Sequence, residues 1–359
     1  MELTSDPAGP LASVHADLGV SWGEDAGRLV PECYGALDAE YRAVIEGRAF
    51  AHRAWIDLLE IRGNDRRRFL HGYVTCDVQG LAAGATAYGF VPSVQGKVLA
   101  EAVVLAREQS LLVELPSGCG AAVAKHLGKY LIADDVSIEE RPDLVPLTLF
   151  GSEAELEVGA AQLAAGASTL EAATLFEIPV LADRRPVWGM PSLTLWVAAE
   201  EAPAFFQRLL EAGRCVGLRP VGVAALETRR VELGVPRFGR DFGADHFPQE
   251  TGLDEGAVSY TKGCYLGQEV IARIHYRGQV NRVLRGLRLD GQSAGALPSD
   301  GSELALDGRP LGALSSAVGS PALAAPIALA IVHRRGAEPG TRVTVEGGGE
   351  AEVAALPFV

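Results

Sequence analysis

The segment KGCYLGQE at residues 262–269 places one cysteine, Cys264, between a glycine and a tyrosine. A thiol becomes a nucleophile or a metal ligand as its thiolate, which nearby positive charge and backbone N–H groups stabilise. Between positions 262 and 288 there are six basic residues and one acid, Glu269, which gives a local charge of +5. The pattern predicts a functional thiol beside an anion site. The alternative is that Cys264 is a buried packing residue and the arginines form a solvated strand edge.

A second group of residues that could do chemistry lies in ETRRVELGVPRFGRDF, residues 227–242. Glu232 lies near the end of a predicted helix, just before a glycine and a proline that turn the chain. A carboxylate offers two acceptor oxygens in one plane, so Glu232 could accept paired N–H groups from a flat heterocycle. The alternative is an ordinary ion pair with Arg229, three residues earlier on the same helix face.

Composition excludes several functional classes. The formal charge of −14 in 359 residues opposes generic binding to nucleic acid, because the summed field repels phosphate backbones. The five cysteines are widely spaced and form no C-x-x-C pair, so we expect neither a disulfide framework nor a metal site. No run of about 20 apolar residues could cross a bilayer, and no basic segment followed by an apolar run opens the chain. We therefore expect a soluble, cytoplasmic protein.

The predicted helices and strands that must position these residues alternate along the chain. Apolar spacing, glycines and prolines predict helices over residues 36–50, 65–73, 119–132, 202–213 and 222–233. Strand composition marks residues 55–63, 87–106 and 110–116, and the last 75 residues read as short alternating strands of an antiparallel barrel or sandwich. Residues 1–35 show little periodicity and are expected to be a loosely docked extension. The fold class is α+β with an all-β C-terminal domain.

Four segments together resemble a known family. They are KGCYLGQEVIARIHYRG (262–278), IRGNDRRRFLHGYVTCDVQGL (61–81), RRVELGVPRFGRDF (229–242) and GRPLGALSS (308–316). In order and spacing the chain resembles the folate-binding YgfZ proteins, which are relatives of the glycine-cleavage T-protein, an aminomethyltransferase. The likeness runs from about residue 36 to 335, and K-G-C-Y-x-G-Q-E is its most specific part.

The resemblance implies a three-domain ring around a cavity that holds tetrahydrofolate or a one-carbon derivative. The implied boundaries are an extension (1–35), two interleaved folate-binding domains (36–54 with 143–220, and 55–142 with 221–280) and a β-barrel (281–359). It implies that Glu232 contacts the pterin ring. The other residues that we expect around the cavity are Tyr88, Arg229, Lys262, Gln268 and Arg273, with arginines available for the glutamate tail of folate.

One departure from the T-protein pattern bears on function. T-proteins carry an acidic pair, one member of which is tied to catalysis, where this chain has Ala100 and Glu101. We therefore expect a folate-binding accessory protein that assists assembly or repair of iron–sulfur enzymes, and through them sulfur-dependent tRNA modification, with Cys264 as its functional thiol. Its expected partners are folate and iron–sulfur enzymes or cluster-assembly proteins, with no direct nucleic acid and no membrane, and we expect a monomer. The alternatives are a folate-dependent aminomethyltransferase and a thiol redox protein on the same scaffold.

Overall fold

The computed structural model describes residues 9–164, 169–290, 297–347 and 349–359. The chain divides into two compact units and enters each of them more than once. The first unit comprises Met1–His71, Asp77–Tyr88 and Ala102–Leu226, and the second comprises Gly72–Cys76, Gly89–Glu101 and Glu227–Val359. The chain therefore passes between the units five times. Each unit is built from segments that are far apart in the sequence.

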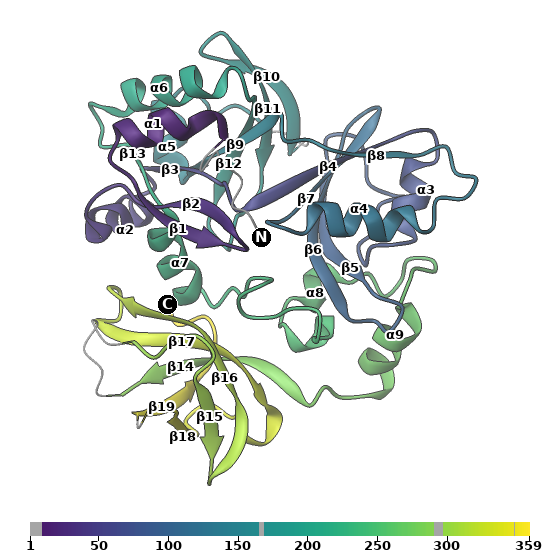
Figure 1. The fold of residues 1–359 in the computed structure, drawn as a ribbon, viewed down its shortest axis with the longest axis vertical. Coiled ribbons are helices and arrows are strands. Elements are labelled where there is room, and N and C mark those ends of the chain that lie inside the picture. Colours follow the sequence, from purple (N-terminus) through teal and green to yellow (C-terminus); the bar gives the residue numbers. More distant parts are fainter. Residues whose placement is uncertain (1–8, 165–168, 291–296, 348) are drawn as a thin grey trace. The chain divides into compact units, whose positions relative to one another are not determined.

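A six-stranded sheet forms the centre of the first unit (Figure 1). Neighbouring strands run antiparallel except β13 and β3, which are parallel. In spatial order the strands are β10 (Leu170–Leu175), β11 (Ile178–Arg184), β12 (Ser192–Ala198), β9 (Leu144–Phe150), β3 (Ala49–His52) and β13 (Arg219–Pro220). One face of this sheet carries the helices α1 (Ala12–Asp17), α5 (Ser152–Glu157) and α6 (Ala202–Gly213).

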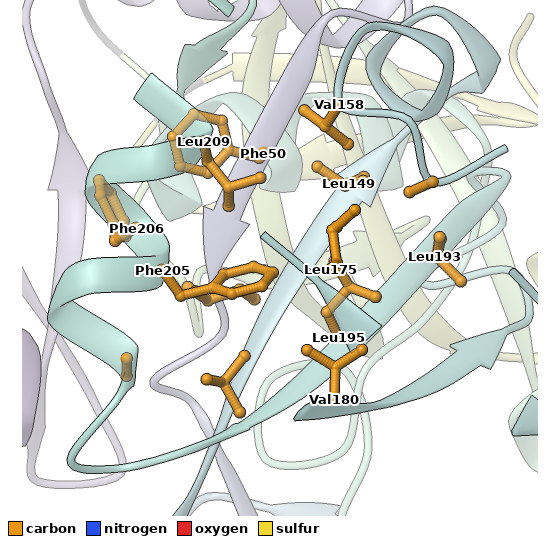
Figure 2. Packing of buried hydrophobic residues seen from close by; sticks show 14 of the residues in the cluster. Phe50, Leu149, Val158, Leu175, Val180, Leu193, Leu195, Phe205, Phe206 and Leu209 are labelled. Carbon is orange, nitrogen blue, oxygen red and sulfur yellow. The ribbon is translucent and has the colours of Figure 1, made fainter. Parts of the chain in front are cut away.

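The helix-covered face of the sheet holds the main core of the first unit. Alternate residues of β9 and β12 point into it, because successive side chains of a strand face opposite sides. Figure 2 shows the strand residues packing against Phe205, Phe206 and Leu209 of α6. The strand residues that it labels are Phe50, Leu149, Leu175, Val180, Leu193 and Leu195. Helix α6 forms because its apolar residues recur at helical spacing and so share one buried face.

The opposite face of the same sheet is buried and ionic. Arg53 bonds both oxygens of Glu114, at 2.8 and 2.9 Å, and its Nε donates to Thr148 at 2.9 Å. Arg185 also pairs with Glu114. Burial alone would raise the pKa of Glu114, but the charges of Arg185 and Arg53 outweigh it and lower the pKa to about 2. Removing one partner would leave a buried charge uncompensated, so this network fixes the packing of the layer.

A five-stranded sheet follows the order β5 (Thr86–Pro92), β6 (Val98–Ala106), β7 (Ser110–Pro116), β4 (Ile56–Arg62) and β8 (Ser137–Glu140). Strands β5 and β6 carry the chain from one unit to the other. The helices α3 (Arg66–His71) and α4 (Gly120–Gly128) also belong to the first unit. So do the 3-10 turn Gly9–Leu11, helix α2 (Leu37–Ile45) and a hairpin of β1 (Ser21–Asp25) and β2 (Arg28–Cys33).

A closed six-stranded barrel makes up most of the second unit. Around the barrel the strands are β14 (Arg282–Leu289), β17 (Ala325–His333), β16 (Arg309–Ser320), β15 (Glu303–Leu306), β18 (Arg342–Val345) and β19 (Gly349–Ala354). Buried leucines, valines and alanines of these strands fill its interior. The barrel is preceded by α7 (Val223–Glu232), the 3-10 turn Pro248–Glu250, α8 (Asp254–Ala257) and α9 (Gln268–Arg277), and a further 3-10 turn, Arg334–Gly336, follows β17.

The structure confirms the α+β class and the C-terminal barrel. The helix predicted over 36–50 is shorter, because Ala49–His52 pairs with β9 as strand β3. The extension predicted at 1–35 lies partly outside the described residues. From position 9 onward it forms α1, β1 and β2, and it buries Leu11 and Val14 in the core, a pattern too short to show helical periodicity. No helix within the described ranges is long and apolar enough to cross a membrane.

Candidate functional site

The thiol of Cys264 is exposed, on a short loop that leads into α9. The alternative that Cys264 is a buried packing residue is therefore wrong. The loop ends at Gly267, which has φ +77°, and a Cβ built there would lie 2.4 Å from the carbonyl oxygen of Ser93. Gly96, in the same β5–β6 turn as Ser93, has φ +75° and also approaches Gly267. Only glycine allows this backbone conformation and this contact together, which explains the glycine three residues after Cys264.

The loop is fastened to the segment Gly72–Cys76 on both sides of the thiol. Before the thiol, Lys262 Nζ donates to the carbonyl oxygens of Val74 and Cys76, each at 2.7 Å. After it, the Leu266 amide donates to the Gly72 carbonyl at 2.9 Å. The ammonium of Lys262 is thus buried and engaged with backbone oxygens. It holds the loop in place, and the position of Cys264 is set by backbone contacts from a distant part of the chain.

Aromatic rings surround the base of this loop. Tyr265 is buried, its ring lies 4.9 Å from Lys262 Nζ, and burial raises the pKa of its hydroxyl to about 12. Tyr260 stacks on His275 of α9 with ring centroids 3.6 Å apart. The Tyr260 hydroxyl donates to Asp254 at 3.2 Å. These contacts tie the residues before Cys264 to α9 and α8, while Cys264 itself is exposed.

Glu232 lies at the last turn of α7 and is fully buried. Its Oε2 accepts from Arg229 Nη1 at 3.0 Å, and its Oε1 accepts from Ser320 Oγ at 2.6 Å. The ion pair with Arg229 that was the alternative interpretation is therefore present. The planar carboxylate fits the donor edge of a pterin chemically, but it has no exposed surface here. Because the carboxylate is buried, a pterin contact at Glu232 requires a neighbouring side chain such as Arg229 or Ser320 to move aside, and it stays a prediction.

An ionic network next to Glu232 joins α7 to the barrel. Arg230 donates to Glu227 at 2.6 Å, to Asp241 at 2.7 Å and to Ser316 of β16 at 2.9 Å. Arg237 also donates to Glu227, at 3.1 Å. Burial alone would raise the pKa of Glu227, but the charges of Arg230 and Arg237 outweigh it and lower the pKa to about 2. The network sets the orientation of the helix that carries Glu232.

The predicted site residues fall into three places. Lys262, Cys264, Gln268 and Arg273 share one loop and helix, where Arg273 is exposed and Gln268 is half-buried. Arg229 and Glu232 share α7 in the same unit. Tyr88 belongs to the first unit, where it packs half-buried against an apolar cluster that includes Trp196. Their assignment to a folate site stays a prediction.

Two parts of the site could not be identified from the sequence. The segment Gly72–Cys76 holds the thiol loop mainly through its backbone, and backbone acceptors leave no trace in residue types. Arg229 and Arg230 are adjacent in the sequence, and the sequence does not show that Arg230 is the buried one. The signal that could have indicated the buried position of Arg230 is the helical spacing of α7, because residues three apart share one face of a helix.

The predicted basic patch does not form one cluster. Arg282 pairs with Glu250 at 2.9 Å, and Arg285 donates to the Ala337 carbonyl at 2.7 Å, both from barrel strand β14. Arg273 and Arg277 instead lie on α9, as exposed residues with no bonded partner among the described residues. The local charge of +5 is thus divided between a helix and a barrel strand.

The position of the expected acid pair lies on β6. Ala100 is fully buried, while Glu101 is half-buried. The alternation of the strand turns Val98, Ala100 and Ala102 to the same buried side. An acid at position 100 would therefore have to be buried, and alanine is the side chain present. Within the described residues, no group of three or more His, Cys, Asp or Glu side chains could hold a metal ion.

Comparisons with known proteins agree along nearly the whole chain. Residues 11–262 match the family described as GCVT N-terminal domain, and residues 282–359 match the glycine cleavage T-protein C-terminal barrel domain. The chain is 28% identical to the aminomethyltransferase of Saccharopolyspora erythraea and 27% identical to that of Cutibacterium acnes, with 97% of each chain covered in both cases. The crystal structure of glycine cleavage system aminomethyltransferase T from Bartonella henselae has the same fold. Its TM-score is 0.85 at 20% identity, over 98% of this chain and 97% of that one.

Proposed function

The chain belongs to the glycine-cleavage T-protein family, and from this premise we propose that it binds tetrahydrofolate or a one-carbon derivative of it. Support comes from relatives named aminomethyltransferase that match over 97% of the chain. The buried carboxylate of Glu232 is the acceptor that we assign to the pterin ring. Arg229 would then act as the gate residue, because its guanidinium bonds Glu232 Oε2 at 3.0 Å and is partly exposed.

We further propose that the reactive group of this protein is the thiol of Cys264. The observation that carries this proposal is the contrast between two positions in the second unit. Cys264 is exposed on a loop fixed by Lys262 and by the Leu266 amide, whereas position 100 is a fully buried alanine. Such a protein would serve as a folate-dependent accessory factor for iron–sulfur enzymes, in which the chain presents a thiol to a partner.

The residues have separate roles in this proposal. Glu232 accepts N–H groups of the ligand, and Arg229 covers or uncovers it. Lys262 and Leu266 hold the loop so that Cys264 stays outside the packed interior. Bound folate would supply one-carbon chemistry. Protonating it would need a group on the protein, and Glu101 is the carboxylate at the position nearest in sequence to that expected for the catalytic acid.

A second candidate is folate-dependent aminomethyl transfer. It is favoured by the names of the relatives and by their full-length match. It requires Glu101 to take the role of the expected catalytic acid despite the alanine at position 100. The two candidates share folate binding and differ in which residue is indispensable, Glu101 or Cys264.

The first experiment is an anaerobic equilibrium titration of the purified protein with tetrahydrofolate. We expect saturable binding that Glu232→Gln weakens, because the amide offers one acceptor oxygen in place of two. Glu338→Gln, a matched change at an exposed position of the barrel, should bind like the wild type. No saturable binding by a folded sample would refute the folate proposal.

A second experiment separates the two candidate functions. Cells that lack the protein are supplied with Cys264→Ala or Glu101→Gln, and the activity of an iron–sulfur enzyme is measured. The same variants are assayed in vitro for methylenetetrahydrofolate formation from an aminomethyl-lipoyl carrier. Loss of the cellular function in Cys264→Ala, without any transfer activity in the wild type, supports the accessory role. Transfer activity that depends on Glu101 and not on Cys264 would establish the aminomethyltransferase and refute the thiol proposal.

A further inference from the structure

The first unit contains a cavity of about 280 Å³ that the proposed function does not use. Its walls come from the N-terminal turn, the β1–β2 hairpin, β3, β4, β9 and β12. Much of the lining is apolar, including Pro10, Leu29, Ile56 and Leu144. His52 and Arg28 are among its polar lining residues. Cavities of this kind, apolar with a few polar groups, are where proteins bind small organic molecules.

A chain of hydrogen bonds ends at the imidazole that lines this cavity. The Tyr34 hydroxyl lies 2.8 Å from His15 Nδ1, and His15 Nε2 lies 3.0 Å from His52 Nδ1. His15 is fully buried, and its ring stacks on that of His52 at 5.3 Å between centroids. Burial lowers the pKa of His15 to about 4 and that of His52 to about 3, so both rings are neutral near pH 7.

The Tyr34 hydroxyl, at one end of this series of hydrogen bonds, determines which atom donates in each of them. A phenol is a better hydrogen-bond donor than acceptor, and a neutral imidazole has one N–H and one bare nitrogen. Tyr34 therefore donates to His15 Nδ1, which puts the His15 proton on Nε2. That proton is donated to His52 Nδ1, so the proton of His52 is on Nε2. His52 Nε2 has no partner among the described residues, although the ring lines the cavity.

We propose that this cavity binds a small organic carboxylate, which accepts a hydrogen bond from His52 Nε2–H beside the positive charge of Arg28. The Arg28 side chain lies at the rim, where it is 45% exposed although it is paired with Asp57. Its Nη atoms hold the carbonyls of Ala54 and Ile56 and the carboxylate of Asp57, which fixes the guanidinium at the wall. The apolar walls would enclose the hydrocarbon part of the ligand.

The other charged groups of the lining are already engaged or exposed. Arg53 is held by Glu114, Thr148 and Thr194, and Arg141 pairs with Glu60 and Asp143. The carboxylate of Asp57 accepts from Arg28 and from the Gly120 amide. Glu140 is exposed. Two buried side-chain N–H groups of the lining have no hydrogen-bond partner among the described residues, His52 Nε2–H and the indole N–H of Trp196, and the His52 ring is the one that the Arg28 charge acts on.

Benzoate is the probe, because it joins a carboxylate to a compact apolar body. The full-length ¹⁵N-labelled protein is titrated near neutral pH while long-range ¹H–¹⁵N correlations of the imidazoles are recorded. In the free protein we expect His52 to carry its proton on Nε2. Benzoate should shift that nitrogen saturably, and benzamide, which has the same shape without charge, should bind at least about tenfold more weakly, as loss of a charge-assisted bond implies.

Two variants test the site and one serves as control. Leu29→Trp fills the cavity from its half-buried wall and should abolish the benzoate shift. Tyr34→Phe removes the donor that fixes the tautomers and should weaken benzoate at least about fivefold, as loss of one ordered hydrogen bond implies. His333→Gln, in the barrel, should change nothing. The proposal is overturned if the proton of His52 is on Nδ1, if benzamide binds as tightly as benzoate, or if neither Leu29→Trp nor Tyr34→Phe affects binding. Absence of any saturable shift in the folded wild type also overturns it.

Discussion

The buried arginine of α7 offers a stringent test of how the second unit is held together. Replacing Arg230 by methionine keeps a long apolar stem but removes the guanidinium that bonds Glu227, Asp241 and Ser316. Arg230 and Asp241 are both almost completely inaccessible to solvent. The variant would leave two carboxylates in the interior with fewer partners, and neither can move to water without disturbing the contact between α7 and β16.

The expected loss of stability is about 3–5 kcal/mol, the range for removing one partner of a buried pair. The pKa of Glu227 gives a second figure of the same order, which is the net effect of burial and of the charges of Arg230, Arg237 and Arg240 together. Its fall from 4.5 to about 2 corresponds, at about 1.4 kcal/mol for each pH unit, to about 3 kcal/mol. Because the folded pKa is depressed, this stability is fully present above pH 4.5 and is lost as the pH falls towards 2. The difference between wild type and Arg230→Met should therefore shrink across that window.

The assay can separate the two units, because the four tryptophans, at positions 22, 55, 188 and 196, all lie in the first. Urea unfolding followed by tryptophan emission reports the first unit, and hydrogen exchange of β16 amides reports the second. Arg230→Met should lower the opening free energy of β16 and leave the emission midpoint in place. Arg208→Met, at an exposed pair with Glu211, should change either by less than about 0.5 kcal/mol. A loss below about 1 kcal/mol at β16 would refute the reasoning.

Three further outcomes follow from the contacts described above. A short pulse of iodoacetamide on the native protein should label the exposed thiols Cys264 and Cys215 ahead of the other cysteines, as read by peptide mass spectrometry. Gly267→Ala should cost at least about 1–2 kcal/mol, because it forces a left-handed residue into contact with the β5–β6 turn, and should loosen the thiol loop in hydrogen exchange. The folded pKa values of His15 and His52 lie below 6.5, so the urea midpoint of tryptophan emission should fall as the pH drops from above 6.5 to about 4.

The apolar periodicity of the sequence predicted some helices and strands and missed others. The apolar spacing of residues 202–213 gave helix α6 with the bounds that the structure has, and Gly234, with φ +69°, ends the turn after α7. Helix α9 was not predicted, although Val270, Ile271 and Ile274 lie at helical spacing; only Ile271 of these is buried. Strand β3 was not predicted because its four residues are buried on both faces and so lack alternation, and because it begins only a few residues after α2.

Some residues of the site could be predicted from the sequence and others could not. Cys264 and Glu232 could be predicted because a thiol can act as a nucleophile and a carboxylate can accept paired hydrogen bonds. The resemblance placed Lys262 at the folate cavity, which stays a prediction, and it gave no sign that the ammonium donates to the carbonyls of Val74 and Cys76. Backbone acceptors from a remote segment carry no sequence pattern. Pairings of this kind become visible only when the chain is folded.

The tie between Lys262 and the segment Gly72–Cys76 has a consequence for biosynthesis. The lysine follows Cys76 by 186 residues, which a ribosome adding about 5–20 residues per second needs about 10–40 s to produce. During that time the carbonyls of Val74 and Cys76 have emerged without the ammonium that they bond in the finished protein. The thiol loop is therefore completed late, and a nascent chain stalled before residue 262 would lack both the cysteine and its fastening. A chaperone that holds the early segments open until the C-terminal third arrives would favour this fold.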